Sequence, residues 1–380
     1  MKKLARYTLF IALYHLSFYG IAAASDTFNF KGQLSFDYIG SDTSSKWQNQ
    51  AILRYIPDVT IQKTLPNGYL WDLNASSNIY ADYQSQPEST YSNDASFYRL
   101  NVRLKTVQSD SQLGLQQINF GPAVILRSLR WFDQVSPTDP LKLSEGVKGL
   151  RYRYFFSNNA NLWLWTLYGN HDPKGYEAVA TKHDTPEAGG RFQYPLESGE
   201  LGLSLHLRST ERLGFSGTSI GEDLQERRLA LDGKWDIGPG IWYEYVIVDQ
   251  GAGAKVNNNW LNMLTLGADY TLAIGNGVHV LAEHLVSALS DKATQWDQRT
   301  QTSALQLSYP VGILDAVSLL TVYSWTQAQQ FHYFRWDRTY DNLVFSIGVF
   351  HSPDQATVKS DLAPTGFSGN GIQAVIVYNH

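Results

Sequence analysis

The chain of 380 residues contains no cysteine, so disulfides, thiolate metal sites and cysteine nucleophiles are excluded. Charged residues are few, at 17%, and the formal net charge of −5 argues against a general nucleic-acid binder. After the N-terminal segment, no run reaches the roughly 18 apolar residues that a membrane-spanning helix needs. A role inside a membrane would therefore require strands.

Hydrophobic and aromatic residues are plentiful and spread along the chain. They make up 43% and 13% of it, which excludes a disordered protein and suffices for one large or two ordinary domains. The many tyrosines and tryptophans suit the aromatic girdles of a membrane barrel, and the alternative is the core of a soluble sandwich.

Residues 1–24 are predicted to be a secretory signal peptide. Lys2, Lys3 and Arg6 form a basic start, an apolar stretch follows over 8–21, and Ala22-Ala23-Ala24 offers a cleavage site of small residues. We place the cut after Ala24, and a first buried helix is the alternative. The mature chain is expected to leave the cytoplasm.

Strict alternation of apolar and polar residues fills the remaining segment, 25–380. Between Phe28 and Tyr38 apolar residues take every second position except Gly32, and the same period recurs over 50–62 and 71–83. Soluble sandwich strands usually have about 5 to 6 residues, whereas strands that cross a hydrocarbon layer need about 9 to 11. The pattern predicts an all-β fold, a single antiparallel transmembrane β-barrel.

Short turns and long polar connections alternate along the chain, as is typical of outer-membrane barrels. Turns such as Pro66-Asn67-Gly68 are assigned to the periplasmic rim, and longer segments such as 40–50 and 84–95 to extracellular loops. Eight turns and nine loops predict about 18 strands. The alternative is 16, because Phe331–Phe350 gives two strands only if it is split at 339–342.

Basic residues are concentrated between Phe97 and Arg153, where the sequence has nine basic and four acidic residues. Tyr98 and Leu100 are predicted to point to lipid, which turns the intervening positions inward. Alternation thereby places four arginines on the inner wall: Arg99, Arg103, Arg151 and Arg153. A plainer interpretation is that these arginines pair with inward carboxylates, with Asp58, Asp72 and Asp82 as possible partners, or bind lipopolysaccharide phosphates.

The connection 121–146 is too apolar for an ordinary surface loop. It is predicted to fold into the barrel and constrict it, which would place Arg127, Arg130, Trp131 and Asp133 where a solute passes. The alternative is a plug or a lid packed on the barrel wall.

The motif Gly114-Leu-Gln-Gln-Ile-Asn-Phe-Gly121, the Arg127, Arg130 and Trp131 cluster, and Gly146-Val-Lys-Gly-Leu150 resemble outer-membrane porins of the alginate-export type. The resemblance implies an 18-stranded barrel with a selective pore for an anionic polysaccharide. Leu115 stands where those porins tend to have an arginine. By analogy the solute would contact Arg99, Arg103, Arg127, Arg130, Arg151 and Arg153.

Catalytic and metal-binding motifs are weak. The sequence has no G-x-S-x-G elbow, and Pro353 after His351-Ser352 breaks a lipase-like pattern. Strand alternation sends His284 to the face opposite His279 and Glu283, so the three cannot share a metal. We expect no catalytic residue, no metal and no cofactor.

These observations predict an integral outer-membrane β-barrel that passes a hydrophilic, anionic or sugar-type solute passively. The expected partners are outer-membrane lipid, lipopolysaccharide, the barrel-assembly machinery and the solute, with no nucleic acid. The oligomeric state stays open. The alternatives are a barrel enzyme that hydrolyses lipid or peptide, and a closed surface-binding or structural barrel.

Overall fold

The computed structural model describes residues 27–43, 46–85, 88–177, 179–210, 224–251, 259–353 and 368–380. The predicted signal peptide, 1–24, lies outside these ranges. Within them the chain forms 18 strands, and none of the described residues form a helix long and apolar enough to cross a membrane. The strands are β1 (Thr27–Thr43), β2 (Lys46–Thr64), β3 (Leu70–Gln84), β4 (Thr90–Lys105), β5 (Ser109–Gln116), β6 (Val147–Phe155), β7 (Asn161–Leu167), β8 (Glu187–Leu196), β9 (Gly199–Thr210), β10 (Leu224–Asp236), β11 (Gly240–Asp249), β12 (Trp260–Leu272), β13 (Val278–Ser290), β14 (Gln298–Pro310), β15 (Asp315–Ser324), β16 (Gln329–Thr339), β17 (Leu343–Ser352) and β18 (Gly369–Asn379).

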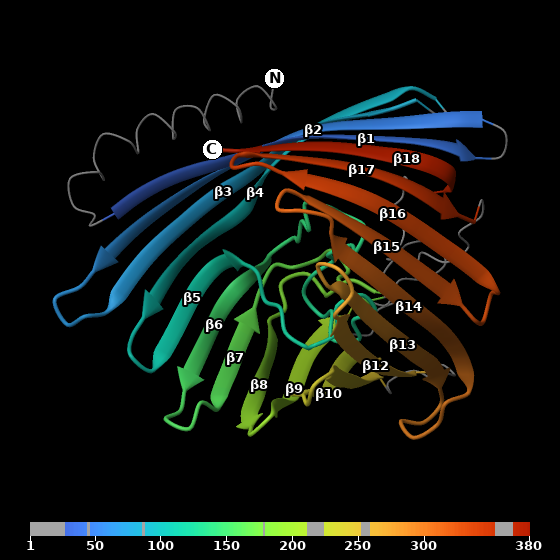
Figure 1. Ribbon diagram of the computed structural model, residues 1–380. Coiled ribbons are helices and arrows are strands. Elements are labelled where there is room, and N and C mark those ends of the chain that lie inside the picture. The colour runs from blue at the N-terminus through green and yellow to red at the C-terminus, as the bar shows by residue number, and fades with distance from the viewer. Residues whose placement is uncertain are drawn as a thin grey trace.

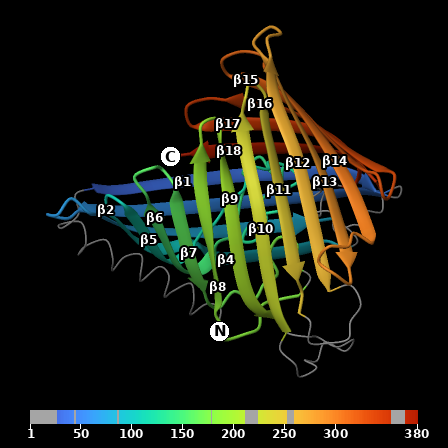
Figure 2. The same ribbon diagram turned by 90° about the horizontal axis from the view of Figure 1, so that it is seen from below.

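The strands close into one antiparallel barrel. Each pairs with its neighbours in sequence, and β1 also pairs with β18, with Leu34 opposite Tyr378 (Figure 1). Strands on opposite sides of the ring cross steeply in Figure 2, as expected for strands tilted against a barrel axis. The predicted all-β barrel of 18 strands is confirmed. Phe331–Phe350 divides into β16 and β17, so the alternative of 16 strands is wrong.

Successive side chains point to opposite faces of the wall, and β9 illustrates the result. Leu203 and Leu205 are exposed on the outer surface, whereas Ser204, His206 and Arg208 are buried on the inner side. The same alternation on most strands gives the barrel an apolar outside, whereas its inner side combines buried polar side chains with a cluster of buried apolar ones. Polar groups that need partners therefore meet one another in the interior.

Two segments predicted to be loops are largely strand. β1 and β2 stay paired as far as Thr43 opposite Lys46, so 40–50 is a long hairpin. β3 and β4 likewise pair as far as Gln84 opposite Thr90, within the predicted loop 84–95. The prediction failed because polar composition was taken to mark a loop, whereas backbone pairing continues without an apolar face.

A β-bulge in β4 overturns the prediction that Tyr98 points to lipid. The pairing register with β3 shifts between Ser76 and Ser77, which leaves Tyr98 as an extra residue. Its hydroxyl accepts a hydrogen bond from the backbone N–H of Ser144 at 3.3 Å, and the guanidinium of Arg99 lies 4.0 Å from its ring centroid. A strict two-residue alternation cannot locate such an insertion, because the bulge reverses the order of inward and outward positions from one side of it to the other.

The tight pairing of β4 with β5 can be tested by substituting Gly114. Its φ is +121°, and a Cβ there would lie 2.2 Å from the carbonyl oxygen of Leu100. We expect Gly114→Ala to lower the free energy of unfolding by about 1–3 kcal/mol, the usual cost of a strained backbone. Urea unfolding in lipid vesicles measures it, with Gly312→Ala, where a Cβ meets open space, as the control. Equal midpoints for the two variants would contradict the analysis.

Candidate functional site in the barrel interior

The connection between β5 and β6, residues 117–146, contains no strand and lies inside the ring of strands (Figure 1). Its side chains Ile125, Leu126 and Leu129 are buried, and they belong to one apolar cluster with inward residues of the wall such as Trp242. Burial of these side chains favours a segment packed on the wall over one in water.

Glu283 of β13 fixes the first part of this segment. Its carboxylate accepts hydrogen bonds from three successive backbone N–H groups, those of Val124 at 2.7 Å, Ile125 at 2.9 Å and Leu126 at 2.6 Å. The indole Nε1–H of Trp242 donates to it at 3.1 Å. Four donors satisfy one buried charge, and charge-assisted hydrogen bonds of this kind are the strong ones.

Glu244 of β11 provides a second attachment. It accepts hydrogen bonds from the backbone N–H groups of Ala123 at 3.0 Å and Leu129 at 2.8 Å. Next to it, the hydroxyls of Ser128 and Thr265 lie 2.5 Å apart. The segment is thus held at both ends of a short stretch, against β11, β12 and β13.

The role of these two glutamates was missed by the sequence analysis. A signal was present, because each is an isolated carboxylate at an inward position between apolar inward neighbours. Such a carboxylate must find donors that the strand itself does not supply.

The arginines and the tryptophan predicted on the infolded segment are buried. Arg127 is 8% exposed, Arg130 5% and Trp131 3%. Arg127 donates to both oxygens of Asp133, at 2.7 and 2.9 Å, and Arg130 lies 5.1 Å from the ring centroid of Tyr176. Burial lowers the pKa of Arg127, but Asp133 outweighs it and raises that pKa. In this arrangement the three side chains hold the segment together.

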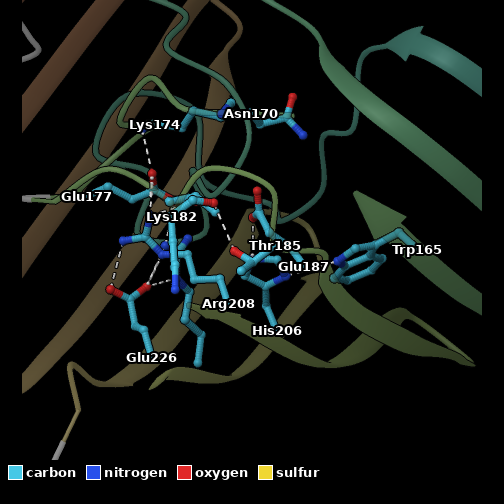
Figure 3. A network of polar contacts seen from close by, with 12 residues as sticks. Trp165, Asn170, Lys174, Glu177, Lys182, Thr185, Glu187, His206, Arg208 and Glu226 are labelled. Atoms are coloured by element: carbon cyan, nitrogen blue, oxygen red, sulfur yellow. Dashed lines mark hydrogen bonds and ion pairs between the residues drawn. The ribbon is translucent and has the colours of Figure 1, made fainter. Parts of the chain in front are cut away.

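A second connection, residues 168–186, is tied to the wall by a buried ionic cluster (Figure 3). Arg208 of β9 donates to both oxygens of Glu226 on β10, at 2.7 and 2.8 Å, and lies 2.9 Å from Glu177 of the connection. Arg228 contacts Glu177 at 2.5 Å and Glu226 at 2.6 Å. Two cations and two anions therefore neutralise each other.

Arg191 on β8 is also paired, since it donates to both oxygens of Asp232 at 2.5 and 2.7 Å. Beside this pair, His206 lies between the indole of Trp165, which donates to its Nδ1 at 3.1 Å, and the carboxylate of Glu187, 3.1 Å from its Nε2. The inward arginines of β8 to β10 are thus matched by carboxylates.

The inner face of β4 to β6 is different. Five cationic side chains point inward, three from β4 after the bulge and two from β6. Asp110 of β5 is the one carboxylate that points inward among them. Arg103 donates to Asp110 from Nε at 3.1 Å and Nη2 at 2.6 Å, and Arg151 lies 3.8 Å from it. We call this set the basic wall: Arg99, Arg103, Lys105, Arg151 and Arg153.

Side chains of the basic wall are partly buried to different degrees, since that of Arg151 is 11% exposed and Arg99 donates from Nη2 to the backbone carbonyl of Ser144 at 2.8 Å. The side chain of Arg103 is 34% exposed. The guanidinium of Arg153 lies 3.9 Å from the ring centroid of Trp163 on β7, and that of Arg151 lies 5.7 Å from it. Trp163 was not predicted from sequence. Its inward position opposite Arg153 in the strand register is set by long-range pairing.

Of the acidic residues proposed as partners of the basic wall, Asp58 and Asp82 accept hydrogen bonds from neutral side chains, whereas Asp72 lies beside Arg103. Asp58 accepts a hydrogen bond from Asn74 at 2.9 Å, and Asp82 accepts one from Gln50 at 3.1 Å. Asp72 stands opposite Arg103 in the strand register. Throughout the described ranges, no ion pair within 4.0 Å joins any of these carboxylates to an arginine.

Where the structure describes the chain, no group of three or more histidine, aspartate or glutamate side chains converges on one point. Glu283 points inward, whereas His284 points outward and shares a hydrogen bond with Ser303 at 2.8 Å. His279 lies 3.4 Å from Asp269. Strand alternation separates these groups as the sequence indicated.

Comparison with solved structures identifies the architecture. OccK2 of Pseudomonas aeruginosa has a TM-score of 0.63 at 8% identity, over 93% of this chain and 98% of that one. For OccAB4 of Acinetobacter baumannii the values are 0.57, 8%, 94% and 99%, and for OmpF of Salmonella typhi in complex with daunomycin 0.55, 12%, 95% and 99%. The chain has the porin fold. No protein-family model and no curated protein matches its sequence.

The attachment of the infolded segment can be tested at Glu283. Gln at this position keeps one acceptor but loses the charge that three backbone N–H groups share. We expect Glu283→Gln to make local opening easier by about 1.5–3 kcal/mol, the worth of a charged hydrogen bond. Hydrogen–deuterium exchange over residues 123–129 should accelerate. Glu197→Gln, in an exposed turn, is the control, and unchanged exchange in Glu283→Gln would contradict the attachment.

The paired and unpaired arginines should differ in their effect on stability. Arg208→Ala leaves Glu226 and Glu177 buried with one cation fewer, and breaking a buried pair costs about 3–5 kcal/mol. Arg153→Ala removes a charge that has no carboxylate within ion-pair distance among the described residues, so its unfolding midpoint should stay near that of the wild type. Urea unfolding of both variants measures the difference, and equal losses would contradict this division of roles.

Proposed function

We propose that the protein is an outer-membrane channel through which a hydrophilic, anionic or sugar-type solute passes without chemical change. The observation that supports this most is the basic wall, where five cationic side chains stand beside one inward carboxylate, Asp110, which pairs with Arg103 and Arg151. Fixed charge of one sign on the wall of a pore raises the local concentration of oppositely charged solutes. An anion is therefore favoured over a cation along this side of the lumen.

The infolded segment gives the lumen an asymmetric lining. Glu244 and Glu283 hold it against β11 to β13, while the basic wall lies on β4 to β6. A solute would thus move between a neutral, packed side and a cationic side. Arg127, Arg130 and Trp131 are left out of the solute path in this proposal, because they are buried. Arg99, Arg103, Arg151 and Arg153 remain in it.

An outer-membrane location is supported by the apolar exterior and by the porin fold. Leucine, isoleucine and phenylalanine side chains are exposed around the barrel, where lipid and lipopolysaccharide would cover them. Residues 1–24 would direct export. The last strand, β18, presents Ile372, Ile376 and Tyr378 outward and would serve the barrel-assembly machinery as its signal.

The solute could be a small anion or an anionic polysaccharide. The resemblance to alginate-export porins favours the polymer, and the basic wall accommodates either, because carboxylate and sulfate groups both pair with guanidinium. Blockage of ion current by added alginate oligomers, compared with neutral oligosaccharides of equal length, separates the two possibilities.

Ion selectivity provides the direct test of the channel. We expect the wild type to form steady, anion-selective pores in a planar bilayer under a salt gradient. Arg151→Gln with Arg153→Gln removes two charges of the basic wall and should shift the reversal potential towards cations. Arg299→Gln, on the outer face of β14, removes a charge outside the lumen and is the matched control. Repeated silent insertions of the wild type would contradict the channel and favour a closed binding or enzymatic barrel.

A further inference from the structure

Two histidines face each other across neighbouring strands on the outer surface of the barrel. His332 of β16 stands opposite His351 of β17 in the register. Both lie close to the strand ends that carry the longer connections, because β16 begins at Gln329 and β17 ends at Ser352. Further along β17 the outward positions are apolar. The pair is thus placed at the edge of the apolar surface.

Each imidazole is oriented by a partner on its far side. Nδ1 of His332 shares a hydrogen bond with the hydroxyl of Thr321 on β15 at 3.1 Å. Nδ1 of His351 lies 2.7 Å from the side-chain oxygen of Asn370 on β18. Since that oxygen is an acceptor, Nδ1–H of His351 donates, and its Nε2 keeps a lone pair. The two partners lie on opposite flanks of the pair.

The ring geometry leaves the two Nε2 atoms on the inner edges. The centroids of His332 and His351 are 6.3 Å apart, with an angle of 23° between the planes. Because Nδ1 and Nε2 occupy different edges of an imidazole, engagement of each Nδ1 on the outer flank directs Nε2 towards the gap between the strands. The two ring planes are thus nearly parallel, and in the tautomer in which Nδ1–H of His332 donates to Thr321 both Nε2 atoms carry a lone pair.

We propose that His332 and His351 bind a divalent late transition metal ion through Nε2, on the outer surface and separate from the channel. With metal–nitrogen distances of about 2.0–2.1 Å, two imidazoles on opposite sides of one ion place their centroids roughly 6 Å apart. Imidazole suits Ni²⁺, Cu²⁺ and Zn²⁺. Thr321 and Asn370 would orient the two rings, the role that hydrogen-bond partners of the second ring nitrogen have in metal-binding histidines. Water would complete the coordination.

Two other histidine arrangements serve as comparisons. His171 and His183 stack at 4.0 Å with 8° between their planes, so no point lies in both ring planes, where a shared metal would have to sit. His284 has an Nδ1 partner in Ser303, but Leu266 stands opposite it on β12. The first arrangement therefore has two neighbouring histidines but no shared metal position, and the second has an oriented imidazole but no second histidine opposite it.

Isothermal titration of Ni²⁺ into the tag-free mature protein, folded in detergent at neutral pH, tests the site. We expect one ion per chain, lost in both His332→Gln and His351→Gln. Binding should persist in His284→Gln and in the double variant His171→Gln with His183→Gln. Asn370→Ala should weaken it about 10-fold, as loss of an outer partner does.

Cu²⁺ paramagnetic resonance adds a readout that does not depend on affinity alone, because two bound imidazoles give hyperfine coupling to two nitrogens. Each variant is first checked for the heat-dependent gel mobility of a folded barrel. No binding to the wild type, binding that survives His351→Gln in folded protein, or a signal from one nitrogen would each overturn the proposal.

Discussion

Attachment of an uncharged backbone segment to two buried carboxylates determines how the interior is organised. Glu244 and Glu283 stand on the inner wall of β11 and β13 and receive five backbone N–H groups from residues 123–129. A buried carboxylate without donors would be costly, and so would a buried backbone N–H without an acceptor. Here the backbone N–H groups are the donors for the carboxylates, and the carboxylates are the acceptors for the N–H groups. The segment is consequently fixed against β11 to β13 at residues 123–129, while its later part reaches β4, where Arg99 donates to the backbone carbonyl of Ser144 at 2.8 Å.

The arginines of the interior divide into two groups by their partners. Arg191, Arg208 and Arg228 form close ion pairs with buried carboxylates, and a buried pair is chiefly a condition for folding. The basic wall holds more cations than carboxylates, so it produces a field that reaches into the lumen. The same residue type thus serves stability on β8 to β10 and, in our proposal, selectivity on β4 to β6. The two uses differ in the number of inward carboxylates, which match the arginines on β8 to β10 and are fewer than the cationic side chains on β4 to β6.

Much of the fold follows from the sequence, because side-chain alternation and turn residues are local. They predict the closed barrel, its 18 strands and the division of Phe331–Phe350. The bulge at Tyr98 was not predictable, since one inserted residue reverses the face without changing composition. Ion pairs such as Arg208 with Glu226 depend on register between strands, which the sequence does not encode locally. The contribution of Glu244 and Glu283 depends on a segment more than a hundred residues away.

The chain has no native cysteine, which permits a direct test of where the infolded segment lies. Ser128 and Thr265 have hydroxyls 2.5 Å apart, so Ser128→Cys with Thr265→Cys joins the segment to β12. The decisive measurement is the conductance of this variant in a bilayer before and after reduction. We predict that the disulfide forms on folding and that conductance is the same in both states. Failure to cross-link, or a pore that widens markedly on reduction, would contradict a segment fixed on the β11 to β13 wall.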